Sequence, residues 1–397
     1  MKFRLHSSKK SNPKKKVSYY IRKKDKRHHK KHYDIKYKYI GDTRIKIKEW
    51  HDNDGIPLVS PEATAKIDDS LSPKERKKAE KLFKKAKKAQ KKAEAQEKKA
   101  IHDRKKHRFP RRHGDRPDGR RVRDINGMQR FMPFIMKDRC DAQNTYSDSF
   151  DITEIEKFCR AKVKSGMTNF SMLHVLLAAY VRTVSQRPAI NRFISGQEVF
   201  SRYEIAVVMT VKKHMSIDAS DTCIKVVFEP TDTVDEVYRK FNEVVEKSIG
   251  PNADTDFDNF ANAFKKIPRW LFRFAVWLLN KLDYHGWLPK ALLDISPFHG
   301  SMIITSMGSL GIKPIYHHIY NFGNLPVFLA YGMKRTVVGI DKDGEVTRKR
   351  YVDLKAVTDE RICDGYYFAS SFKLFKKYVE DPSVLETPPE KVYDDIM

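Results

Sequence analysis

Cysteine is scarce in this 397-residue chain, and long apolar runs are lacking. The apolar run from Phe274 to Leu279 is bounded by Arg273 and Lys281 and is far too short to span a bilayer. The first thirty residues are basic and lack the apolar segment of a signal peptide. The four cysteines are scattered without a Cys-x-x-Cys pair, which indicates neither a zinc site nor a disulfide framework: Cys140, Cys159, Cys223 and Cys363. We therefore expect a cytoplasmic protein without a bound metal.

Positive charge is concentrated at one end of the chain. Residues 1–123 hold 43 Lys and Arg against 16 Asp and Glu, a net charge of +27, whereas the other 274 residues are nearly neutral. Such an asymmetry favours a polyanion partner for the N-terminal arm: nucleic acid, an anionic membrane surface or an acidic protein. A solvated tail is the plainer alternative. No finger, helix-turn-helix or RNA-binding signature accompanies the charge, so sequence-specific recognition is not expected.

The arm divides into segments of different character. Residues 1–32 are too polar to predict order in isolation. Residues 33–40 and 45–50 alternate polar and apolar side chains around Gly41-Asp42, which predicts a β-hairpin. Ser72-Pro73 begins a charged helical run that continues to about Arg108, and residues 109–123, rich in Pro, Gly and Arg, are typical of a linker. We expect an arm over residues 1–123 and a body over residues 124–397.

The body alternates predicted strands and helices, as in an α/β fold. Residues 168–184 predict a buried helix in which His174 is a hydrogen-bonded core residue, and residues 205–211 and 224–228 predict strands. Residues 233–249 predict an amphipathic helix. Bulky groups at 267–293 are typical of core or of a subunit contact. A lid, an acyl-chain pocket or a membrane-surface contact is the alternative.

The C-terminal stretch carries the most specific pattern. It reads Asp359-Glu-Arg-Ile-Cys-Asp-Gly365 and runs into a helix that ends at Asp381-Pro382. The stretch resembles the signature of the acyltransferase (E2) subunits of 2-oxo-acid dehydrogenase complexes and of chloramphenicol acetyltransferase, which carry His-x-x-x-Asp-Gly. Glu360 stands where that family has its catalytic histidine. Asp364 stands as in the family, where it holds the motif in place, although an Asp-Gly helix cap is an equally good interpretation.

A second stretch carries the same resemblance. Ser301 to Gly311 is similar to the family's Phe-Thr-Ile-Ser-Asn-Leu-Gly segment and places Thr305 where a serine stabilises the oxyanion, with Ser306 one residue later. His317 and His318 follow in a loop that the resemblance places near the substrate channel. By themselves, a hydroxyl beside a glycine turn and paired loop histidines are commonplace structural features.

The resemblance covers about residues 124–390 and implies a complete architecture. It implies a two-layer α/β domain, with a mixed sheet backed by helices, and a homotrimer whose sites lie between subunits. It also implies coenzyme A or acyl-coenzyme A as co-substrate, with a small-molecule acyl acceptor that the sequence does not identify. Residues 1–123 contain no lipoyl-type Asp-Lys-Ala hairpin, so we expect a stand-alone enzyme without a covalent lipoyl group.

Replacing histidine by glutamate changes the proton chemistry. The pKa gap between base and thiol grows from about 2 to about 4 units, which adds roughly 3 kcal/mol to proton transfer. Burial raises a glutamate pKa and restores the match. Two interpretations stay open. One is an acyltransferase with Glu360 as base and Thr305 as oxyanion donor. The other is a trimeric pseudoenzyme that acts as scaffold or sensor and is tethered to a polyanion by its arm.

Overall fold

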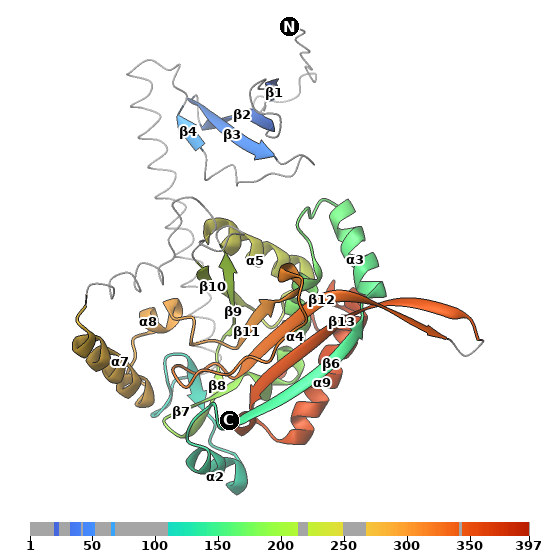
Figure 1. The fold of residues 1–397 in the computed structure, drawn as a ribbon. Helices are drawn as coiled ribbons and strands as arrows, with labels where there is room; N and C mark the ends of the chain where they lie inside the picture. The colour runs from blue at the N-terminus through green and yellow to red at the C-terminus, as the bar shows by residue number, and fades with distance from the viewer. Residues whose placement is uncertain are drawn as a thin grey trace. The chain divides into compact units, whose positions relative to one another are not determined.

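The computed structural model divides the chain into two compact units, Met1–Arg108 and Phe109–Met397 (Figure 1). It describes residues 110–212, 221–248, 267–340 and 344–396, together with the backbone of four strands in the first unit.

The first unit contains a four-stranded antiparallel sheet. Its strands lie in the order β1 (Tyr20–Lys23), β2 (His32–Ile40), β3 (Thr43–His51) and β4 (Ala65–Ile67). The predicted hairpin is confirmed, since β2 and β3 pair along their length. Strand β1 lies within residues 1–32, for which no order was expected. The helix expected between Ser72 and Arg108 lies outside the described residues.

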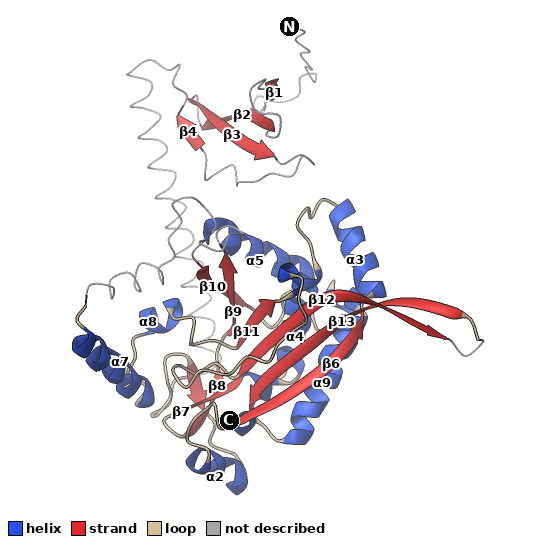
Figure 2. Ribbon diagram, in the orientation of Figure 1, coloured by secondary structure: helices blue, strands red, loops and turns tan. Residues whose placement is uncertain are grey.

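The second unit is organised around a mixed six-stranded sheet, drawn in red in Figure 2. Strand β11 is parallel to its neighbours β9 and β12, and the other pairs are antiparallel. The strand order is β10 (Asp221–Phe228), β9 (Ile205–Lys212), β11 (Met302–Ser306), β12 (Val327–Ile340), β13 (Val346–Asp359) and β6 (Gln143–Asp151).

Helices cover one face of this sheet and form the main core. The central helix is α4 (Met172–Gln186), and it packs against α3 (Thr153–Lys164), α5 (Val234–Ser248) and α9 (Gly365–Glu380). Alternate residues of the strands point into this core, for example Met302 and Ile304 of β11. The predicted two-layer arrangement of a mixed sheet backed by helices is confirmed.

Among the described residues, a loop rather than a helix covers part of the opposite sheet face. The loop runs from the short 3₁₀ helix η2 (Gly308–Leu310) to β12 and places Ile319 against Phe328 and Val357, with Ile303 at the edge. The sheet therefore has a packed helical face and a loop face.

A three-stranded sheet stands beside the main sheet in the order β5 (Gly119–Arg121), β8 (Glu198–Arg202) and β7 (Arg192–Ser195). Strands β7 and β8 form a hairpin around Gly196 and Gln197, which both have positive φ, as a tight two-residue hairpin requires. Strand β5 corrects the interpretation of residues 109–123 as linker. Arg116 and Arg120 are buried in the second unit, so these two basic side chains serve packing there.

Most predicted helices are confirmed within a few residues, and shorter elements complete the unit. His174 of α4 is the expected core histidine. Its Nδ1 accepts a hydrogen bond from the Ser171 backbone at 3.0 Å, and burial lowers its pKa to about 4. No helix in the described part of the chain has the length and apolar character needed to cross a bilayer. The remaining helical elements are α2 (Gly127–Ile135), α7 (Arg269–Tyr284), α8 (Lys290–Ile295), η1 (Pro188–Asn191), η3 (Glu360–Ile362) and η4 (Pro382–Leu385).

Replacing Leu177 by alanine tests the core. Leu177 lies in α4 with 0% of its surface exposed, so the substitution leaves a cavity and lowers the free energy of unfolding by about 2–5 kcal/mol. Urea denaturation measures the loss. The matched control is Val338→Ala, because Val338 is 61% exposed on β12 and we expect a change below about 0.5 kcal/mol. Equal losses in the two variants would contradict the described core.

Candidate functional site

Glu360 begins η3, directly after the end of β13. Its side chain is exposed, and its backbone N–H donates to the Ala142 carbonyl at 2.8 Å. The next residue, Arg361, points the opposite way and is 3% exposed. The burial expected of a base at this position is therefore not provided by the described residues of a single chain.

A buried ion cluster lies beneath Glu360. The Asp359 carboxylate accepts two hydrogen bonds of 2.8 Å from the Arg361 guanidinium, and Arg139 Nε lies 3.5 Å from it. Arg361 also donates to the Met136 carbonyl at 2.7 Å, beyond the end of α2. Arg139 donates to carbonyls of the loop and of β7, at Tyr320, Gly323 and Ile194. We call Asp359, Arg361 and Arg139 the arginine clamp.

Asp364 and Cys363 have structural positions beside the clamp. Asp364 is the N-cap of α9 and accepts a hydrogen bond from the Tyr367 backbone at 2.9 Å, which is the helix-cap interpretation of this residue. Cys363 is buried, and burial raises the pKa of its thiol to about 12. The thiol therefore stays protonated and unreactive at neutral pH.

Thr305 and Ser306 point to opposite faces of the sheet. Successive strand residues alternate, so Thr305 shares the loop face with Ile303 of the same strand, and Ser306 shares the helical face with Ile304. This separation gives the two hydroxyls different surroundings, a distinction that the sequence did not predict.

His317 lies on the same face as Thr305. Its ring stacks on Phe328, with centroids 4.3 Å apart and planes within 8°. Phe328 pairs with Ile303, two residues before Thr305, which places the imidazole on the order of 10 Å from the threonine. Burial lowers the pKa of His317, so the ring is neutral near pH 7. Among the described residues, none offers its buried Nε2 a hydrogen bond.

His318 is placed differently. It is exposed and meets the ring of Tyr320 edge to face, at a centroid distance of 5.3 Å. Thr305 and His317 therefore share the loop face without touching, whereas exposed His318 contacts Tyr320.

Glu360 and Thr305 are far apart within one chain. Thr305 pairs with Ala330, which pairs with Lys355, and Glu360 follows five residues later. With about 3.3 Å per residue along a strand and about 4.8 Å between strands, their Cα atoms lie on the order of 20 Å apart. A site that uses both side chains therefore needs two copies of the chain.

A groove of about 880 Å³ opens on the helical side of the same strand end. Ser306, Ser309 and Tyr331 line it near the sheet. An apolar wall is supplied by α3, which includes Ile155, by Phe170 in the segment that follows α3, and by the start of α4. Gly308 makes this turn possible, because a Cβ there would lie 2.6 Å from the Gly332 carbonyl oxygen. Four cations border the groove: Arg160, Lys164, Lys334 and Arg350. Glu156 pairs with Lys334 at 2.7 Å and Arg350 at 2.9 Å, so the rim keeps a net positive charge.

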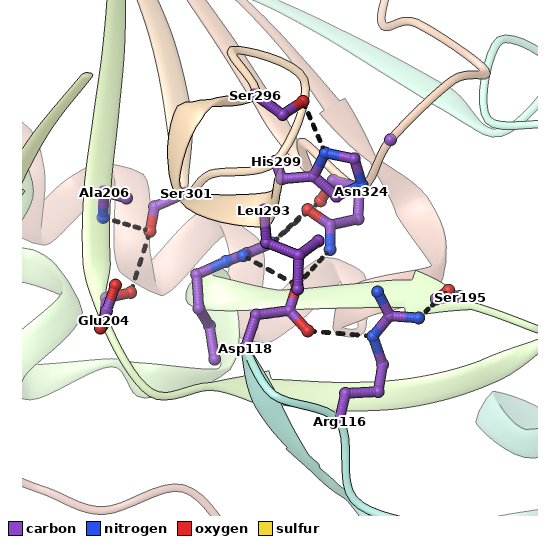
Figure 3. A network of polar contacts seen from close by, with 12 residues as sticks. Arg116, Asp118, Ser195, Glu204, Ala206, Leu293, Ser296, His299, Ser301 and Asn324 are labelled. Atoms are coloured by element: carbon purple, nitrogen blue, oxygen red, sulfur yellow. Dashed lines mark hydrogen bonds and ion pairs between the residues drawn. The ribbon is translucent and has the colours of Figure 1, made fainter. Parts of the chain in front are cut away.

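A second polar network, which the sequence did not predict, includes Arg116, Asp118, Ser296 and His299 (Figure 3). Arg116 Nε lies 3.0 Å from Asp118, and its Nη2 lies 2.6 Å from Asp283 at the end of α7. His299 joins Asp283 at 3.3 Å and Ser296 at 2.8 Å. Burial alone would raise the pKa of Asp283, but His299 and Arg116 outweigh it and hold the pKa well below its usual range.

The Asp283, His299 and Ser296 contacts have the order of a catalytic triad, but their setting is structural. His299 is 3% exposed, and neither cavity described in this unit is lined by these residues. Arg116 and Asp283 are 167 positions apart in the sequence, which explains why local sequence patterns did not reveal this network. In the described part of the chain, no group of three or more His, Cys, Asp or Glu is placed to hold a metal ion.

Comparisons with known proteins give likenesses of fold only. No family model and no curated protein matches the sequence. Among solved structures, a probable dihydrolipoamide acetyltransferase from Listeria monocytogenes has a TM-score of 0.42 at 15% identity over 65% of this chain and 93% of that chain. The cubic core of a pyruvate dehydrogenase multienzyme complex has a TM-score of 0.41 at 15% identity, over 66% of this chain and 93% of that chain.

A chloramphenicol acetyltransferase has a TM-score of 0.38 at 13% identity, over 66% of this chain and 97% of that chain. The chain resembles acetyltransferase cores. This is the resemblance expected from the sequence. At such identities and TM-scores, the reaction and its residues do not follow from the likeness.

Lys225 provides a pH test of the second network. It donates to the Leu293 carbonyl at 2.6 Å and the Ser296 carbonyl at 3.0 Å, and burial lowers its pKa to about 7. Between pH 7 and about 10.5 the unfolded chain binds more protons at this site than the folded chain, so Lys225 makes stability rise with pH. Below pH 7 the lysine is charged in both states and this contribution is lost.

Lys225→Met should remove that rise. Thermal unfolding at pH 7 to 10 should show stability increasing less steeply, or falling more steeply, in the variant than in the parent protein. Lys334→Met is the control, because Lys334 has 46% of its side chain exposed, and its curve should run parallel to the parent's. Parallel curves for Lys225→Met would contradict a buried lysine with a lowered pKa.

Proposed function

We propose that residues 109–397 form a coenzyme A-dependent acyltransferase whose complete site assembles between copies of the chain in a homotrimer. The observation that carries this proposal is the presentation of Glu360: exposed on one chain, yet fixed by the buried arginine clamp directly beneath it. An outward side chain on a rigid base suits a site completed by a second copy. The first unit and the acyl acceptor are not part of the proposal.

Thr305 is the proposed oxyanion donor. Its hydroxyl lies on the loop face near the end of β11, where the neighbouring strands β9 and β12 hold the backbone. A hydroxyl fixed by strand pairing needs little reorganisation as negative charge develops on a thioester oxygen. No helix of the described residues covers this face, so the proposed second copy would approach it there.

Glu360 of the neighbouring copy is the proposed base. Packing of the two copies would remove water from the carboxylate, and desolvation raises the pKa of a carboxyl group toward that of the thiol. The base would then accept the proton of the coenzyme A thiol in one direction and return it in the other. The clamp keeps Arg361 turned away, so its charge does not face the reacting group.

His317 is the proposed positioning residue for substrate. Its neutral ring keeps one nitrogen without a partner among the described residues, on the face that carries Thr305. A neutral imidazole nitrogen can accept a hydrogen bond from an amide or hydroxyl of the ligand. His317 is also the competing candidate for base, and the experiments below separate the two roles.

The groove is the proposed binding place of the coenzyme A phosphates. Its cationic rim suits phosphate groups, and its apolar wall suits the aliphatic part of the ligand. The groove opens at the end of β11 on the helical face of the sheet. A long ligand could therefore extend from the groove past the Gly308 turn toward Thr305 on the other face. Ser306 would then be a contact in the substrate channel.

A non-catalytic scaffold or sensor is the second candidate function. The exposure of Glu360 on a single chain favours it, because an unburied carboxylate is a poor match for a thiol proton. This candidate keeps the trimer and the ligand site but loses turnover.

Three single substitutions test the catalytic roles. Glu360→Gln should lower the release of coenzyme A thiol from acetyl-coenzyme A about 100-fold or more, because it removes the base. Thr305→Val should cause a loss of about 100-fold by removing the oxyanion donor. His317→Gln should raise KM more than it lowers kcat. Turnover unaffected by Glu360→Gln but abolished by His317→Gln would move the base to His317.

The pH profile gives an independent reading of the same variants. With Glu360 as base, the pH dependence of kcat/KM survives His317→Gln and is lost in Glu360→Gln. With His317 as base, kcat/KM increases with pH with a midpoint below pH 6.5, because burial lowers the pKa of His317. This increase disappears in His317→Gln. If the pH dependence of kcat/KM persisted in both Glu360→Gln and His317→Gln, neither residue would be the base.

Charge reversal at the groove tests the ligand site. Acetyl-coenzyme A should raise the melting temperature of the full chain by mass action. Arg160→Glu/Lys164→Glu should reduce that shift, because both side chains are exposed at the rim. The control Arg348→Glu/Lys349→Glu changes the same charge on the exposed part of β13. Equal melting-temperature shifts in the two double variants would mean that the phosphates bind elsewhere. A melting-temperature shift in the parent protein without any turnover would support the non-catalytic scaffold.

A further inference from the structure

Helix α7 presents aromatic side chains to solvent. Trp270 is 70% exposed, Phe274 52% and Trp277 54%. At this spacing they fall on one face of the helix, and the rings of Phe274 and Trp277 stack with centroids 5.7 Å apart. We call these three residues the aromatic stripe. Leu271 and Leu278 flank it, 37% and 40% exposed, which makes a continuous apolar surface of the kind that marks an interaction site.

The opposite side of α7 is attached to the body. Asp283 near its end is held by Arg116 and His299, and the Tyr284 hydroxyl donates to Gln197 at 2.9 Å. Ala275, Val276 and Leu279 are half-buried. The buried polar network thus fixes how the helix is rotated and keeps the stripe turned outward. Figure 1 shows α7 at the margin of the unit, away from the six-stranded sheet.

The charges beside the stripe are of one sign. Arg269, Arg273 and Lys281 are exposed on α7, and Lys281 continues the stripe's face. The one acidic residue of the helix, Asp283, is buried in its ion pairs. A stripe of Trp and Phe with a cationic border is the composition of helices that lie in the interface of an anionic bilayer.

Two other occupants fit these observations less well. A second copy of the chain would bring its own Arg269, Arg273 and Lys281 to the contact, so like charges would face one another there. A nucleic acid would satisfy the cations but would leave Leu271 and Leu278 in contact with water. Anionic lipid satisfies both the charges and the apolar side chains.

We propose that α7 docks this protein on an anionic membrane surface, with the aromatic stripe entering the boundary between headgroups and acyl chains. The helix lies along the surface and does not cross it. One such helix gives weak and reversible attachment, and a second cationic element strengthens it. Residues 1–108 hold 37 Lys and Arg against 14 Asp and Glu, and their net charge of +23 supplies that second attraction. The membrane-surface alternative for residues 267–293 is thereby the one that the structure favours.

Vesicle binding by the full chain tests the proposal. Vesicles of phosphatidylcholine with about 30% phosphatidylglycerol are compared with pure phosphatidylcholine, and bound protein is measured by sedimentation at 0.1 M and 0.5 M salt. Salt screens the arm more than it weakens an inserted aromatic stripe. Three of the four tryptophans are Trp270, Trp277 and Trp287, so insertion should shift the emission of the parent protein to shorter wavelength.

The decisive variant is Trp270→Ser/Phe274→Ser/Trp277→Ser. At 0.5 M salt it should bind the anionic vesicles about tenfold or more weakly than the parent. The control Val338→Ser/Ile340→Ser/Val346→Ser removes three apolar side chains that are 61–75% exposed elsewhere, and it should bind as the parent does. Unchanged melting temperatures show that both variants are folded.

Three results would overturn the proposal. Equal binding of the stripe variant and the parent would mean that the arm alone attaches the protein. A smaller oligomer in the stripe variant, with vesicle binding unchanged, would make the stripe a contact between copies. Loss of RNA binding with vesicle binding intact would assign the stripe to nucleic acid.

Discussion

The carboxylate of Asp359 fixes more of this structure than any other single group near the proposed site. With Arg361 and Arg139 it joins the end of β13, the residues after α2, the loop before β12 and β7. Two guanidinium groups on one buried carboxylate satisfy charges that would otherwise be costly to bury. Because Arg361 is drawn inward, Glu360 is turned outward, and its exposure follows directly from the clamp.

The same constraint acts on the loop face of the sheet. Arg139 holds the loop at Tyr320 and Gly323, and that loop carries His317 onto Phe328. The clamp thus orients both the outward glutamate and the loop that brings an imidazole near Thr305. The two candidate bases depend on one buried cluster. A site between copies would combine Thr305 on β11 of one copy with Glu360 after β13 of another.

Thr305 and Ser306, which the sequence motif placed in one site, lie on opposite faces of β11. Thr305 and Ser306 are adjacent in the chain, but the strand sends one to the loop face and the other to the groove. The sequence motif alone could not show that Thr305 and Ser306 face opposite sides of the sheet. Buried Met302 and Ile304 alternate with half-buried Ile303, and this alternation assigns each hydroxyl to a face once the position of the helices is known.

Local patterns predicted much of the fold because they reflect local physics. The apolar run of α4, the β-branched run of β9 and the Asp364 cap of α9 each specify their element over a few residues. The ion networks could not be predicted in this way. Arg116 was assigned to a basic linker, and only the fold brings it to Asp283, 167 positions away. Charge composition alone cannot distinguish an arginine that binds a polyanion from one that anchors a helix.

The central claim is that the proposed base and the proposed oxyanion donor act from different copies of the chain. Its most direct test is the activity of a mixture of Glu360→Gln and Thr305→Val chains, dissociated and reassembled in equal amounts. Every mixed trimer with a site at each contact contains one intact pair, so the mixture should regain about a quarter of the parent turnover from two nearly inactive proteins. A mixture that forms trimers but stays as inactive as its components would contradict a site shared between copies.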